Sequence, residues 1–132
     1  MALTLGGWCV VLDSGNAEEL SLFYEKLLGW TRLVGEEFIT LSNLQQAGFP
    51  TWITFQQIDG YTPPVWPAVP GKQQQMEHLD FHVENMEEGV QHALACGATL
   101  AETQLEEELR VMLDPAGHPF CILPKPAWMN GL

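Results

Sequence analysis

The chain has 132 residues, of which 46% are hydrophobic and 17% charged, a composition typical of a folded globular domain. Five basic residues stand against 17 acidic ones, and the net charge of −12 argues against binding to nucleic acid or to an anionic membrane surface. The same charge would attract a cationic small molecule.

The beginning of the chain contains neither a basic segment nor a long apolar run, so we expect no signal peptide and no membrane span. The three cysteines, Cys9, Cys96 and Cys121, are odd in number and lack a CxxC spacing. This pattern predicts a reduced, cytoplasmic protein with free thiols.

The first half of the chain predicts one helix among several strands. Apolar residues recur at helical spacing from Leu20 to Leu28. Asn16 is the expected N-cap of this helix, with Glu19 in the capping-box position, and Gly29 is the expected stop. Strands are expected over residues 8–13, 30–34, 37–42 and 51–58.

The second half repeats this order after a linker over residues 59–73, which contains four of the nine prolines and therefore forms no regular element. A second helix is expected from the N-cap Asn85, with Glu88 three residues on, to Gly97. Strands are expected over residues 75–83, 98–103, 108–114 and 120–123.

The strand expected over residues 75–83 separates its side chains by parity. Leu79, Phe81 and Val83 share one face, and His78, Asp80 and His82 share the other. The ionisable face suits the wall of a binding cavity. His78 and Asp80 together can serve as a general base oriented by a carboxylate, and the alternative is a solvated or structural polar pair.

The two halves match at a constant offset of 69 residues, which relates Asn16 to Asn85 and Pro50 to Pro119. Such self-similarity predicts a duplication. We therefore expect two βαβββ modules, module one over about residues 5–60 and module two over about residues 74–124.

Three stretches give the chain a resemblance to a known superfamily. They are Phe23-Tyr24 with Leu27-Leu28-Gly29-Trp30, His78 to Val83, and Asp114-Pro115-Ala116-Gly117-His118-Pro119-Phe120. The chain resembles the glyoxalase / bleomycin-resistance / extradiol-dioxygenase superfamily, also called vicinal oxygen chelate. The resemblance implies an α+β fold, in which residues 1–132 form a single domain. Its two modules would form a curved mixed sheet around a cavity, with the helices outside. It also implies a homodimer.

The resemblance further implies four positions for a divalent metal, on the first and last strand of each module. In this chain they carry Cys9, Trp52, His78 and Cys121. Because an indole does not ligate a metal, we expect a pocket without the usual ion and without another cofactor. The alternative is a zinc site made by Cys9, His78 and Cys121, since two thiolates and an imidazole suit zinc.

Strand parity extends the expected pocket beyond these positions. Trp66 of the linker is a further candidate, as an aromatic side chain that stacks on a ligand or covers it. The expected ligand-binding residues are Cys9, Val11, Trp52, Thr54, Gln56, Trp66, His78, His82 and Cys121. We therefore predict a protein that binds a small cationic or aromatic molecule. The alternative is a lyase or isomerase that uses His78 with Asp80, or a divalent metal.

Overall fold

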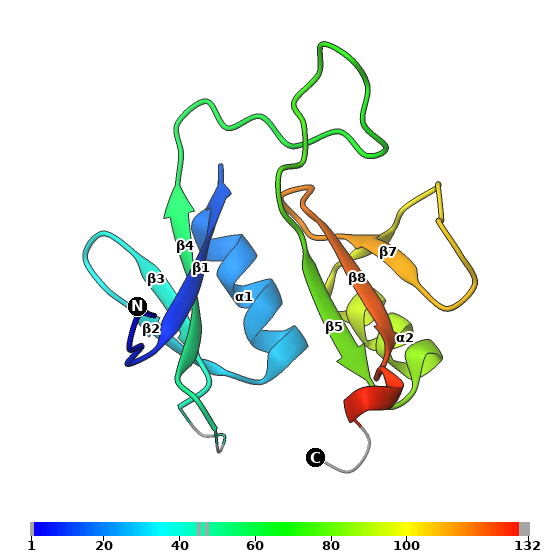
Figure 1. Ribbon diagram of the computed structural model, residues 1–132. Helices are drawn as coiled ribbons and strands as arrows, with labels where there is room; N and C mark the ends of the chain where they lie inside the picture. Colours follow the sequence, from blue (N-terminus) through cyan, green and yellow to red (C-terminus); the bar gives the residue numbers. More distant parts are fainter. Residues whose placement is uncertain (1, 45, 47, 130–132) are drawn as a thin grey trace. The chain divides into compact units, whose positions relative to one another are not determined.

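The computed structural model describes residues 2–44, 46 and 48–129. The chain divides into two compact units, Met1–Tyr61 and Thr62–Leu132. Each unit contains one module with the predicted order of a strand, a helix and three further strands. The α+β class and the duplicated βαβββ order are therefore confirmed (Figure 1).

Module one contains a four-stranded mixed sheet in the order β1-β4-β3-β2. Strand β1 is parallel to β4, and the two other neighbouring pairs are antiparallel. The helix α1 packs on β3 and β4. The elements are β1 (Trp8–Ser14), α1 (Ala17–Leu28), β2 (Thr31–Val34), β3 (Ile39–Ser42) and β4 (Thr51–Gln57).

The ends of α1 lie where the capping residues predict them. The Asn16 Oδ1 atom accepts a hydrogen bond from the Glu19 N–H at 3.0 Å. Gly29 ends the helix with a φ of 68°, a left-handed conformation that favours glycine. The predicted apolar stripe is buried as far as Tyr24 and half-buried at Leu27 and Leu28, and the Tyr24 ring stacks on Phe55 of β4 at 5.9 Å between centroids. This contact fixes α1 on one face of the sheet.

Module two has the same architecture, with strand order β5-β8-β7-β6 and a parallel pair between β5 and β8. The helix α2 packs on β8 and β6. The elements are β5 (Leu79–Val83), α2 (Met86–Cys96), β6 (Thr99–Leu100), β7 (Arg110–Leu113), β8 (Pro119–Pro124) and a short 3₁₀ helix η1 (Ala127–Met129).

The cap of α2 is also confirmed, because the Asn85 Oδ1 atom accepts from the Glu88 N–H at 3.0 Å. Helix α2 approaches its sheet closely at Gly89. A Cβ atom at that position would lie 3.1 Å from the Ile122 side chain and 3.3 Å from that of Val83. The absence of a side chain at Gly89 therefore allows α2 to lie directly over β5 and β8.

Two predicted strands are each four residues shorter in the structure, and the others differ from their predicted bounds by three residues or fewer. The strand predicted over residues 75–83 begins only at Leu79, which pairs with Phe120. The next pair would place His78 opposite Pro119, and a proline has no N–H to continue the ladder.

The strand predicted over residues 98–103 is reduced to the two residues of β6. The Gln104 side chain replaces the missing ladder. Its amide nitrogen donates to the carbonyl oxygens of Ala101 and Val111 at 2.8 and 3.0 Å, and its oxygen accepts from the Val111 N–H at 2.8 Å. The main-chain groups of Ala101 and Val111 are thus hydrogen-bonded by a side chain, so they remain paired although the strand ends at Leu100.

The Pro-rich segment, residues 59–73, contains neither helix nor strand, as predicted. In the part of it that belongs to module two, Val65 donates a main-chain hydrogen bond to the carbonyl oxygen of Gln73 at 2.9 Å. Pro63 lies so close to the turn before β8 that a Cβ on Gly117 would be 2.9 Å from the Pro63 Cβ. The second part of the segment is therefore held against module two. Among the residues that the structure describes, no helix has the length and apolar character needed to cross a membrane.

Candidate functional site

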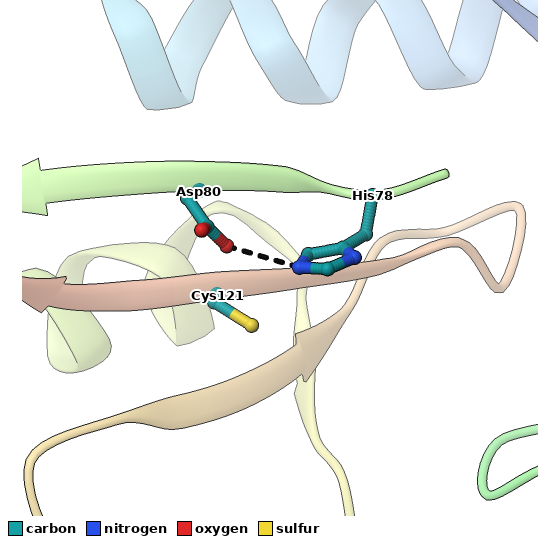
Figure 2. A group of neighbouring side chains, drawn as sticks. All are labelled: His78, Asp80 and Cys121. Atoms are coloured by element: carbon teal, nitrogen blue, oxygen red, sulfur yellow. Dashed lines mark ion pairs between the residues drawn. The ribbon is translucent and has the colours of Figure 1, made fainter. Parts of the chain in front are cut away.

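Three side chains that can donate or accept protons gather on module two. His78 is the residue just before β5, Asp80 lies on β5, and Cys121 lies on the neighbouring strand β8 (Figure 2). The His78 Nε2 atom lies 3.2 Å from the Asp80 Oδ1 atom. The imidazole, carboxylate and thiol atoms all lie within 4.8 Å of one another. We call these three residues the His-Asp-Cys cluster.

The parity of β5 explains why the cluster forms. Leu79, Phe81 and Val83 are half-buried, whereas Asp80 and His82 are exposed. The Phe81 ring packs edge-on against Phe120 of β8 at 5.7 Å, on the face that carries the apolar side chains. The apolar face is thus used for packing, and the ionisable face of the strand remains available, as predicted.

Asp80 links the two other members of the cluster. Its carboxylate lies 3.2 Å from the His78 imidazole, and a carboxylate oxygen lies within 4.8 Å of the Cys121 sulfur. Burial is the main cause that raises the pKa of Cys121, and the charge of Asp80 and a hydrogen bond to it act in the same direction, so that together they raise this pKa to about 11. At neutral pH the thiol is therefore protonated, so it acts as a donor to the carboxylate and is a poor nucleophile.

Replacement of Asp80 by asparagine should lower the pKa of the Cys121 thiol, because the carboxylate stabilises the protonated form. In a background in which Cys9 and Cys96 are replaced by serine, Asp80→Asn should make Cys121 react several-fold faster with iodoacetamide at pH 9 to 10. The measurement is the alkylation rate against pH by mass spectrometry. Glu77→Gln removes an equal charge from an exposed neighbour and is the matched control. Identical profiles for the two variants would contradict the role of Asp80.

The pairing register differs between the modules by two residues, which the constant sequence offset did not predict. In module one Cys9 lies opposite Trp52, 43 residues further on. In module two Asp80 lies opposite Cys121, 41 residues further on. A shift of two residues keeps every side chain on its face. It places Asp80, rather than His78, directly opposite Cys121, and so brings a carboxylate into the cluster.

The candidates of module one also lie together within their own module. Cys9 pairs with Trp52 and Val11 with Thr54, and Gln56 lies opposite Asp13 at the end of the strand pair. The Thr54 hydroxyl lies 3.5 Å from that of Thr40 on β3. Their shared face on β1 and β4 is as predicted.

His82 and Trp66 have different surroundings within module two. His82 is exposed, and its Nδ1 atom lies 3.0 Å from the Pro124 carbonyl oxygen at the end of the strand pair, outside the His-Asp-Cys cluster. Trp66 packs against a buried group formed by Ala101, Val111 and Cys121. The structure thus places Trp66, but not His82, beside a member of the cluster.

The donors of the cluster are chemically suited to a divalent metal. An imidazole nitrogen, a carboxylate oxygen and a sulfur atom form a set that zinc accepts in proteins. The resemblance implied Cys9, His78 and Cys121 as the alternative zinc ligands, and this set did not include Asp80, which the structure groups with His78 and Cys121. The alternation along the strand already placed Asp80 on the same face as His78. Only the strand register, in which Asp80 pairs with Cys121, shows that Asp80 lies beside the thiol.

Comparison with known proteins agrees with this fold. The model of a family described as glyoxalase-like domain matches residues 9–123. Two βαβββ modules, each with one helix and a four-stranded mixed sheet, make up the vicinal-oxygen-chelate fold. The chain belongs to the glyoxalase-like domain family.

Solved structures agree with this fold at low sequence identity. The fosfomycin resistance protein FosX from Mesorhizobium loti has a TM-score of 0.64 and 10% identity, with 97% of each chain covered. A glyoxalase / bleomycin resistance protein / dioxygenase family enzyme from Burkholderia phytofirmans has a TM-score of 0.59 and 20% identity, over 86% of this chain and 94% of that one.

An integron cassette protein from the mobile metagenome of V. cholerae has a TM-score of 0.61 and 19% identity, over 96% of this chain and 98% of that one. At these identities the similarity concerns the fold alone. No curated protein gave a significant sequence match.

Proposed function

We propose that this protein binds a small cationic or planar aromatic molecule through the His-Asp-Cys cluster. The observation that carries the proposal is the Asp80 carboxylate, which lies between an imidazole and a protonated thiol on an accessible strand face. The His78 and Asp80 side chains are 41% and 44% exposed, so a ligand can reach both.

Charge supports a cationic ligand. The chain carries a net charge of −12, which raises the local concentration of cations around the protein. At the site itself, Asp80 is an anion beside two groups that can donate hydrogen bonds to it. A ligand with a cationic nitrogen would add a third favourable partner to this carboxylate.

The test is isothermal titration and thermal-shift measurement with a panel of cationic aromatic compounds, beginning with 1-methylpyridinium and 1-methylnicotinamide. Asp80→Asn should weaken binding about tenfold or more, because a charge-assisted contact is lost. Glu84→Gln, which removes an exposed charge just after the far end of β5, should leave binding nearly unchanged. Absence of binding across the panel would count against the proposal.

A second candidate is a lyase or isomerase that holds a divalent metal on His78, Asp80 and Cys121. The grouping of their three ligand atoms within 4.8 Å supports this alternative. Such a metal would supply Lewis-acid activation of a substrate oxygen. Metal analysis of protein purified without chelators tests it. A stoichiometric metal that is lost in Asp80→Asn and Cys121→Ser, but kept in Cys9→Ser, would favour this candidate over metal-free binding.

We propose Cys9, Val11, Trp52, Thr54 and Gln56 as ligand-contacting residues of module one considered by itself, on the grounds of the resemblance and strand parity. His82 of module two is proposed on the same grounds. A homodimer is proposed from the resemblance, and a cytoplasmic location from the odd number of cysteines without a CxxC spacing. Light scattering of the purified protein tests the dimer.

A further inference from the structure

Trp66 differs from the other aromatic residues of module two in having a covered polar atom without a partner. Its indole ring packs on the buried group of Ala101, Val111 and Cys121, beside Leu109, Leu113 and Leu123. The indole N–H is buried, and no acceptor for it exists among residues 2–44, 46 and 48–129. Buried polar groups in proteins nearly always have a hydrogen-bond partner, so this donor requires an explanation.

Packing by itself does not require the N–H. The neighbours of the ring are apolar side chains and a cysteine, and a phenylalanine could fill much of the same space. A donor that is kept away from water and left unpaired lowers stability in the free protein. A residue of this kind fits a role in which the acceptor is supplied by a bound molecule.

The position of Trp66 connects it to the candidate site. The buried group on which it packs includes Cys121, whose sulfur lies within 4.8 Å of an Asp80 carboxylate oxygen. Asp80 of the cluster therefore offers a carboxylate acceptor, and the buried group that includes Cys121 carries the Trp66 indole donor. A ligand that satisfies both must carry a cationic or donating group and an acceptor atom.

We infer that Trp66 is a specificity-determining residue, whose indole N–H donates a hydrogen bond to a carbonyl or carboxylate oxygen of the bound molecule. This inference rests on the proposed function and narrows its ligand class to cationic aromatic molecules that also bear an acceptor oxygen. The aromatic face of Trp66 forms part of the wall of the binding site. Its N–H favours those ligands that carry an acceptor oxygen. The role is thus distinct from simple stacking.

Two matched probes test the inference. 1-Methylpyridinium and 1-methylnicotinamide are both planar cations, and only the second carries a carbonyl acceptor. We expect the second to bind about five- to tenfold more tightly, the gain of one hydrogen bond, and Trp66→Phe should abolish this preference. In ¹H–¹⁵N spectra the Trp66 indole proton, assigned by its loss in Trp66→Phe, should move downfield with 1-methylnicotinamide alone.

A structural role is excluded by a second measurement. Trp66→Phe should leave the urea midpoint of the free protein unchanged or higher, because the unpaired donor is removed with little loss of ring area. Trp128→Phe, at an exposed indole of the same module, is the control for both measurements. A clear fall in the midpoint of Trp66→Phe, with the probe preference intact, would overturn the inference.

The remaining outcomes separate the inference from the proposal on which it rests. If the His78 resonances respond to both probes and the Trp66 indole proton responds to neither, the inference is wrong and the proposed binding site stands. If no probe of the cationic aromatic panel perturbs His78, both are wrong. A metal-dependent response of His78 and Cys121 without any response of Trp66 also contradicts the inference.

Discussion

Phe120→Ala is expected to destabilise the protein by about 3–5 kcal/mol, the usual range for removing a fully buried aromatic ring. Phe120 has no exposed surface and packs edge-on against Phe81 at 5.7 Å. Its loss would leave a cavity beneath the two strands that carry the His-Asp-Cys cluster. The free energy of unfolding from urea denaturation measures the effect. Leu105→Ala, at a side chain that is 63% exposed, should stay within about 0.5 kcal/mol of the parent.

The equivalent variant of module one tests whether residues 1–132 behave as a single domain. Phe55 is also fully buried, and it stacks on Tyr24 at 5.9 Å. If the two modules unfold together, Phe55→Ala and Phe120→Ala will each lower the urea midpoint of one and the same unfolding transition. Two transitions, each sensitive to only one variant, would contradict the prediction of a single domain.

Asp114→Ala is expected to destabilise the protein by about 3 kcal/mol, because it leaves two part-buried main-chain donors without their Asp114 acceptor. Asp114 is 4% exposed, and its Oδ1 atom accepts from the N–H groups of Ala116 and His118 at 2.9 and 3.0 Å. These hydrogen bonds shape the turn in which Gly117 adopts a φ of 87°. The turn leads directly into β8 and so positions Cys121.

Asp114→Asn is the matched control, since its amide oxygen can still accept from both main-chain groups. It should lower the free energy of unfolding by about 1 kcal/mol, the difference between a charged and a neutral acceptor. In the protein whose other cysteines are serine, Asp114→Ala should also speed the alkylation of Cys121 by loosening the start of β8. Equal losses of stability in the two variants would show that the turn does not depend on these hydrogen bonds.

Local features of this fold were predictable from neighbouring residues. Asn16 and Asn85 with the glutamates that follow them predicted both helix starts, and Gly29 and Gly97 predicted both ends. These signals suffice because a cap is made by side chains within a few residues of the helix end. The alternation along β5 similarly predicted which face carries His78 and Asp80, since side chains alternate along any strand.

The features that make the candidate site depended on the tertiary structure. The offset of 69 residues in the sequence implied the same pairing in both modules, whereas their registers differ by two residues. Strand register is set by hydrogen bonds between segments far apart in the chain, and local pattern constrains only its parity. For this reason the sequence alone placed Asp80 on the correct face but not opposite Cys121.

The same reasoning applies to Trp66. Its proline-rich surroundings predicted an irregular segment, and the composition of that segment contains no information about where its indole packs. The amino-acid sequence by itself determined the order of elements, the helix ends and the ionisable face of one strand. Only the tertiary structure decided which thiol meets Asp80 and which indole N–H is left buried without a partner among the described residues, because both depend on contacts between distant segments.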